Sequence, residues 1–166
     1  MQMTISNSKS RKNGLTMMID TGLSIRESED FISLCSEYTD IVKFGFGTSF
    51  LTPNLKEKVS LFIESNILVH AGGTLFEYFA IRNQINEYKR FLEKNKINMV
   101  EISDGCIDIS HDKKCNIIRD FKKDFIVISE VGRKNYLEDN KTRKLANMDS
   151  KRTRSWKLES NYRKQR

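Results

Sequence analysis

The clearest chemical anomaly in this sequence is Lys43, an ammonium group inside the apolar segment DIVKFGFGTS (40–49). A lysine at such a place either lies on a solvated strand face or is buried, and a buried lysine needs a carboxylate neighbour. Glu101 and Glu130 are the candidate neighbours, because each belongs to a similar apolar segment. Two interpretations stay open: an ion pair that serves only the fold, or a cation that faces a reaction centre.

Polar groups also stand at the ends of the other apolar segments. They are Asp20, His70 with Gly72, Gly73 and Thr74, Glu101 with Ser103 and Asp104, and Glu130 with Arg133 and Lys134. Carboxylates of this kind can hold a hard cation such as Mg²⁺, and lysine and arginine can meet anionic oxygens. A Gly-Gly-Thr stretch before a helix suits phosphate binding at the helix N-terminus, although alone it is a weak signal. For His70 we favour a structural role over that of a ligand.

The apolar patterns that position these groups alternate between strands and helices. We predict strands at residues 14–20, 40–49, 67–74, 97–105 and 125–134, and helices at 24–39, 55–66, 76–96 and 111–124. Such strands, joined by helices, indicate a parallel sheet whose strands carry the chemistry at their carboxyl ends. No GxGxxG follows the first strand, which disfavours a dinucleotide-binding fold. The predicted class is α/β of the TIM (β/α)8-barrel type. Only about the first five βα units are expected, because a full barrel needs about 250 residues.

Length, charge and cysteine content limit the function classes. The 166 residues suffice for one domain, placed at 14–147 after a polar N-terminal segment, 1–13. The net charge of +7 is concentrated in a basic tail, 148–166, which holds seven of the 29 Lys and Arg and two of the 22 Asp and Glu. The rest of the chain is nearly neutral, so we expect no nucleic-acid partner. The three cysteines form no CxxC pair, which disfavours a zinc site or a disulfide framework.

The hydropathy of the chain argues against a membrane protein. No apolar run approaches the ~20 residues that a membrane-spanning helix needs, and no signal peptide is recognisable. We therefore expect a cytoplasmic protein without a membrane partner, and we leave open whether it forms oligomers.

Several segments together resemble the phosphosulfolactate synthase family over roughly residues 10–135. They are GLTMMIDTGL, DIVKFGFGTSFL, HAGGTLFEY, VEISDGCIDI and ISEVGRK, in this order. The resemblance implies a TIM-type barrel that adds sulfite to phosphoenolpyruvate with Mg²⁺ present, giving phosphosulfolactate for coenzyme M or sulfolactate biosynthesis. The alternative is a non-catalytic, heat-stress-associated relative that acts through protein partners. One departure is HAGG, where the family usually has PGG.

The chemistry that the resemblance implies suggests roles for the polar groups. Sulfite addition creates an enediolate beside a carboxylate and a phosphate, and such an anion needs a divalent metal and fixed cations. We assign catalysis to Lys43, Glu101 and Lys134, substrate binding to Gly72, Gly73, Thr74, Ser103 and Arg133, and Mg²⁺ binding to Asp20, Asp104 and Glu130. The expected small-molecule partners are phosphoenolpyruvate and sulfite.

The resemblance ends at about Asn147, before the family's later strands. The basic tail that follows, 148–166, is interpreted as a disordered segment, a nucleic-acid arm or the product of a frameshift. With synonymous codons, a one-base shift turns the tail into WIQKELEAGNLKVITESK, which reads as a helix followed by the sixth barrel strand. We therefore expect a chain that is truncated or frameshifted after about Asn147, with an out-of-frame, disordered tail and little or no catalysis.

Overall fold

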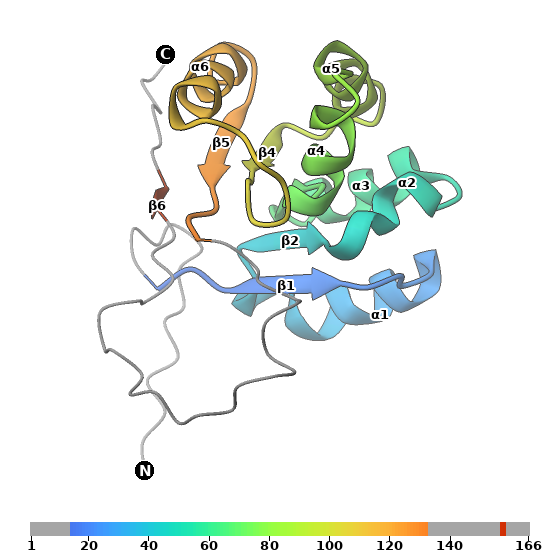
Figure 1. Ribbon diagram of the computed structural model, residues 1–166. Helices are drawn as coiled ribbons and strands as arrows, with labels where there is room; N and C mark the ends of the chain where they lie inside the picture. The colour runs from blue at the N-terminus through green and yellow to red at the C-terminus, as the bar shows by residue number, and fades with distance from the viewer. Residues whose placement is uncertain (1–13, 133–156, 159–166) are drawn as a thin grey trace, which may run out of the picture.

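A computed structural model shows an α/β fold in which helices flank one sheet (Figure 1). It describes residues 14–132 and 157–158. The strands are β1 (Met17–Asp20), β2 (Ile41–Phe44), β3 (Leu68–His70), β4 (Met99–Ile102), β5 (Ile126–Ser129) and β6 (Lys157–Leu158). The α-helices are α1 (Ile25–Cys35), α2 (Thr48–Leu51), α3 (Leu55–Glu64), α4 (Gly73–Ala80), α5 (Ile85–Lys94) and α6 (His111–Phe121). Two 3₁₀ turns, η1 (Ser36–Tyr38) and η2 (Gly45–Gly47), precede β2 and α2.

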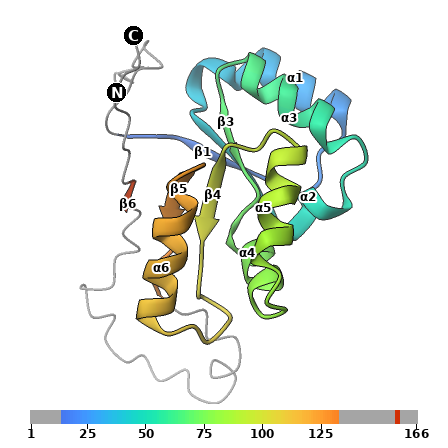
Figure 2. The ribbon, with the colours of Figure 1, turned by 90° about the horizontal axis from the view of Figure 1, so that it is seen from above.

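Strands β1 to β5 are parallel and lie side by side in the order of the sequence. Each connection between them contains at least one α-helix, since a parallel pair needs a crossover. Figure 2 shows α1 beside α3, and α4 beside α5. The α/β class is thus confirmed, and the five parallel strands with their helices are compatible with part of a TIM barrel.

The alternation of side chains along each strand gives the sheet two different faces. The main core lies between the sheet and the helices, and it contains one set of alternate strand residues, among them Val42, Val69 and Val100. Lys43 and Glu101 fall between these positions and therefore belong to the opposite face. The register aligns Lys43 with His70 on the neighbouring strand.

The structure corrects two predicted boundaries. The helix expected at 76–96 is instead two helices, α4 and α5, separated by a turn in which Asn83 has a φ of 56°. This left-handed residue ends the first helix although the apolar periodicity continues across it. The strand expected at 40–49 ends at Phe44, because Gly47 (φ 76°) is the left-handed residue from which α2 begins.

Part of the predicted tail contributes a short strand. Lys157–Leu158 form β6, which pairs antiparallel with β5. The segment 1–13 and the rest of the tail lie outside the described residues, so the predictions on domain boundaries, disorder and a shifted frame stay predictions. Over 14–132 and 157–158, every helix is too short or too polar to cross a membrane.

Candidate functional site

The centre of the candidate site is an ion pair between β2 and β4. The Nζ atom of Lys43 lies 2.9 Å from Oε2 and 3.2 Å from Oε1 of Glu101. The Glu101 side chain is fully buried, whereas that of Lys43 is 15% exposed. The sequence left open whether Lys43 pairs with Glu101 or with Glu130, and in the structure it pairs with Glu101. Because the ammonium keeps some exposure, it can also meet an anionic ligand from solvent.

The two glycines before α4 belong to this centre, but their N–H groups bond to protein atoms. The N–H of Gly73 donates to Glu101 Oε2 at 2.8 Å, and that of Gly72 donates to His70 Nδ1 at 3.3 Å. A Cβ added at Gly73 would lie 2.5 Å from Ser103 Cβ, so the helix start is pressed directly against β4. Thr74, also predicted to bind substrate, follows on the first turn of α4 and is exposed.

His70 is a neutral, buried member of the cluster. Burial, helped by the charge of Lys43, lowers the pKa of His70 from 6.5 to about 3. Since Nδ1 accepts the Gly72 N–H, the ring hydrogen is on Nε2, which faces Met17 Sδ at 3.4 Å. The 3.7 Å approach of Nδ1 to Glu101 is therefore not an ion pair. This environment agrees with a structural role.

Ser103 connects three further groups at the carboxyl ends of β4 and β5. Its Oγ lies 2.5 Å from Oε1 of Glu77 on α4 and 3.0 Å from Oε2 of Glu130, and it accepts the N–H of Gly105 at 3.2 Å. Ser103 and Glu77 are buried, and Glu130 is half-buried. The predicted residues Ser103 and Glu130 thus come together, along with a carboxylate that sequence reasoning missed.

Lys114 of α6 balances the charge beside this group. Its Nζ lies 2.6 Å from Asp104 Oδ1 and donates to the backbone oxygen of Glu130 at 2.6 Å. The side chain of Lys114 is only 9% exposed. An ammonium group therefore occupies the space between Asp104 and the end of β5, where the sequence predicts a metal ion.

Asp20 lies on the other face of the sheet and takes part in a different network. Its Oδ2 is 2.5 Å from Nζ of Lys58 on α3, and both side chains are fully buried. Oδ1 accepts the N–H groups of Gly22 and Leu23 at 2.7 and 2.8 Å. The alternation along β1 explains the separation, because Ile19 is the residue that aligns with Lys43. The structure thus does not bring Asp20 to the other predicted site residues.

These contacts do not provide the predicted magnesium site. Across 14–132 and 157–158, no group of three or more carboxylate, histidine or cysteine side chains has the geometry to hold a metal ion. Asp20 is paired with Lys58, and Asp104 with Lys114. Mg²⁺ binding stays a prediction, and we derive no chemical step from it. Arg133 and Lys134, predicted to bind substrate and to act in catalysis, lie outside the described residues.

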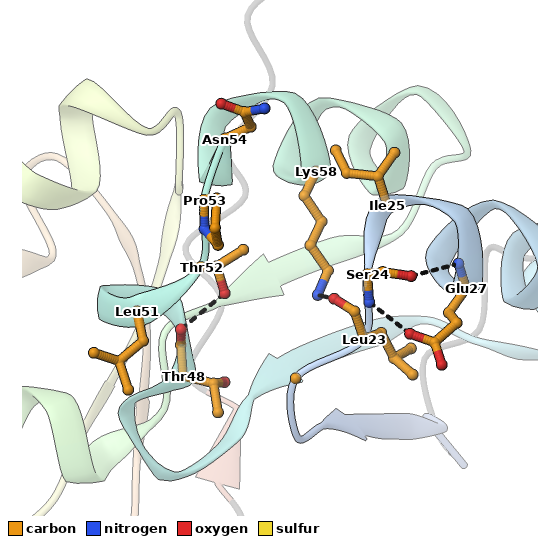
Figure 3. A pocket seen from close by; sticks show the side chains of 11 residues that line it. Leu23, Ser24, Ile25, Glu27, Thr48, Leu51, Thr52, Pro53, Asn54 and Lys58 are labelled. Atoms are coloured by element: carbon orange, nitrogen blue, oxygen red, sulfur yellow. Dashed lines mark hydrogen bonds between the residues drawn. The ribbon is translucent and has the colours of Figure 1, made fainter.

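A pocket of ≈ 420 Å³ is lined by residues other than those of this charged cluster (Figure 3). It is lined by the β1–α1 loop, the region of α2 and the start of α3, and its walls include Leu23, Leu51 and Pro53. Lys58 also lines it, but its Nζ is bound to Asp20 and to the carbonyl of Leu23. None of the predicted site residues lines this pocket, so we place the candidate site at the Lys43–Glu101 centre.

Lys58, Lys114 and Glu77 were missed by sequence reasoning, although the sequence around each of them indicates a buried charge. Lys58 lies on the apolar stripe of α3 with Leu55 and Phe62, and Lys114 is buried on α6 together with Phe121. A lysine on such a stripe must be paired inside the protein. Glu77 is likewise a carboxylate within the apolar stretch LFEYFA, one turn after the glycine pair.

Comparisons with known proteins show the family of this chain. The sequence model of the (2R)-phospho-3-sulfolactate synthase (ComA) family matches residues 5–160, beyond the point at which the sequence resemblance ends. Phosphosulfolactate synthases from Bacillus subtilis (strain 168) and Methanocaldococcus jannaschii are 37% and 40% identical over 134 and 126 residues. These alignments cover 81% and 74% of this chain. They cover 53% and 50% of the two relatives, so the chain spans about half the length of the curated relatives it matches.

A third relative, the phosphosulfolactate synthase of Methanothermobacter thermautotrophicus, is 36% identical over 129 residues, which are 76% of this chain and 50% of the relative. The family match covers all of the described residues, including the Lys43–Glu101 centre and the glycine pair at the start of α4. The chain therefore belongs to the (2R)-phospho-3-sulfolactate synthase family.

Proposed function

We propose that this chain acts in the addition of sulfite to phosphoenolpyruvate to form (2R)-phospho-3-sulfolactate. The observation that carries the proposal is the Lys43–Glu101 pair at the carboxyl ends of β2 and β4, in a chain of this family. The ammonium is held in place by a fully buried carboxylate, which is in turn fixed by the Gly73 N–H. We assign the reaction to the cytoplasm, as expected from the hydropathy of the chain, and, as the resemblance implies, to coenzyme M or sulfolactate biosynthesis.

The reaction accounts for a fixed cation in this position. The sulfur lone pair of sulfite attacks the methylene carbon of phosphoenolpyruvate and forms the C–S bond. The electrons of the broken C=C π bond move to C2 and onto the carboxylate, which gives an enediolate, and C2 then takes up a proton. Negative charge thus accumulates beside a phosphate, and a preorganised ammonium stabilises it more than water does.

Lys43 is suited to this task because Glu101 restricts its orientation. The carboxylate contacts Nζ through both of its oxygens, which holds the ammonium in one position. The partial exposure of Lys43 leaves it within reach of a substrate oxygen. Mg²⁺ would supply further charge stabilisation to such an intermediate, but the described residues do not form a site for it.

The test is the conversion of phosphoenolpyruvate and sulfite, followed by ³¹P NMR, with the purified chain at high concentration, because little turnover is expected of a chain that spans about half the length of its relatives. We expect Lys43→Met to lower turnover by about 100-fold or more, as the loss of one charge-stabilising group does in other enzymes. Lys123→Met is the matched control, because its side chain is 72% exposed and pairs only at the surface with Asp120. Ordinary turnover in a folded Lys43→Met variant would remove Lys43 from the site, and no product from the native chain would contradict the proposed function.

A further inference from the structure

Glu77 attaches α4 to the loop that follows β4. Its Oε1 accepts the hydroxyl of Ser103 at 2.5 Å and the N–H of Cys106 at 3.2 Å. The shorter contact has the length of a hydroxyl–carboxylate bond, one of the stronger hydrogen bonds in proteins. Glu77 is 3% exposed, so water contributes little to its solvation. A buried carboxylate is costly unless such donors compensate it.

The same helix is bound to β4 at a second point. Gly73, one turn before Glu77, donates its N–H to Glu101, which is two residues before Ser103 on the same face of β4. Glu101 of β4 and Ser103, one residue beyond the end of β4, therefore both bond to the first turn of α4. This contact is so close that it leaves no space for a Cβ at residue 73, and glycine allows it because it has none.

The position of Ser103 in turn affects Glu130. Ser103 has one hydroxyl hydrogen, which it can donate to only one carboxylate at a time. The 2.5 Å contact favours Glu77, and Glu130 Oε2 contacts the same Ser103 oxygen at 3.0 Å. Glu77 thus sets the orientation of the hydroxyl, and while Ser103 donates to Glu77 it does not donate to Glu130.

We propose that Glu77 is a positioning residue that fixes Ser103 and the loop to Cys106 beside the Lys43–Glu101 centre. The role in catalysis rests on the proposed function, whereas the attachment itself does not. An apolar side chain would fill the same buried space without the desolvation cost, so a carboxylate is explained by what it orients.

The attachment is tested by amide hydrogen exchange of the whole chain, followed by NMR. Glu77→Ala should speed exchange of the Cys106 and Gly105 amides by about tenfold or more, because Cys106 loses its acceptor and Ser103, the acceptor of Gly105, loses the bond that orients it. Glu77→Gln should keep both protected, since its amide oxygen can accept the same bonds. Ser103→Ala should expose Gly105 and leave Cys106 protected. Glu87→Ala, which loses a surface pair with Arg90, is the control that should change neither.

The catalytic part is tested with phosphoenolpyruvate and sulfite. We expect kcat to fall by about tenfold or more in Glu77→Ala and Ser103→Ala, with little change in KM and with recovery in Glu77→Gln. Unchanged protection of Cys106 in Glu77→Ala would overturn the inference, and so would lost protection with an unaltered kcat. A native chain without turnover would contradict the proposed function, and the amide pattern would then decide alone whether Glu77 fixes the loop.

Discussion

The buried pair of Asp20 and Lys58 allows a sharp prediction about stability. Lys58→Met removes the ammonium but keeps a long side chain in a fully buried space. Asp20 would retain only the N–H groups of Gly22 and Leu23 as donors. A carboxylate without its counter-charge would then remain inside the protein, where the desolvation penalty is high.

The structure allows the size of this effect to be estimated. Both side chains have zero exposure, so solvent does not screen the 2.5 Å contact. Breaking a buried pair of this kind costs about 3–5 kcal/mol. The Nζ of Lys58 also lies 5.2 Å from the ring centre of Phe44, a cation–π contact worth up to about 2 kcal/mol when desolvated. Because whole domains have a free energy of unfolding of about 5–15 kcal/mol, the variant should be close to unfolding.

Urea unfolding followed by circular dichroism measures this effect. Lys56→Met is the matched control, since Lys56 is exposed on the same helix, α3, and should change stability by less than about 0.5 kcal/mol. The double variant Lys58→Met with Asp20→Asn removes both charges and keeps an acceptor oxygen. It should be more stable than the two single effects predict, by about 2 kcal/mol. Equal stability of Lys58→Met and Lys56→Met, or strict additivity in the double variant, would refute the reasoning.

Two further predictions concern the candidate site. Gly73→Ala should lower the free energy of unfolding by about 1–3 kcal/mol in a urea titration, because its Cβ would lie 2.5 Å from Ser103 Cβ; unchanged stability would contradict the close contact. The pKa of His70 is lowered from 6.5 to about 3 in the fold, so the unfolded chain binds a proton first as the pH falls. The native chain should therefore lose about 2 kcal/mol of stability from this group between pH 7 and pH 5. His70→Gln should lack that part of the loss, and identical pH profiles of the two chains would contradict it.

The sequence was sufficient to predict the order of the strands and the meeting of Lys43 with a carboxylate. Apolar segments spaced by helices define parallel neighbours, and a lysine within such a segment must find an acid nearby. Ser103 and Glu130 also come together as expected, since they follow the carboxyl ends of the neighbouring strands β4 and β5. Lys43 and Glu101 lie on β2 and β4 with β3 between them, and they meet because both side chains point to the same face of the sheet.

The face on which Asp20 lies was not predicted. A strand buried on both faces shows no alternation of apolar and polar residues, so its sequence does not reveal which side chains point toward the helices. The register of β1 against β2 decides this, and it places Ile19 rather than Asp20 beside Lys43. The roles of Lys58 and Lys114 were missed because both lie on helices, whereas sequence reasoning considered polar groups at the ends of the strands.

The loop after β4 has a practical consequence for measuring ligand binding. Cys106 has an exposed side chain, whereas Cys35 and Cys115 are half-buried. The backbone N–H of Cys106 donates to Glu77, so the thiol lies next to the group formed by Glu77 and Ser103. A fluorescent dye coupled selectively to this sulfur would report in its emission whether an anion has entered beside Lys43, without any need for turnover.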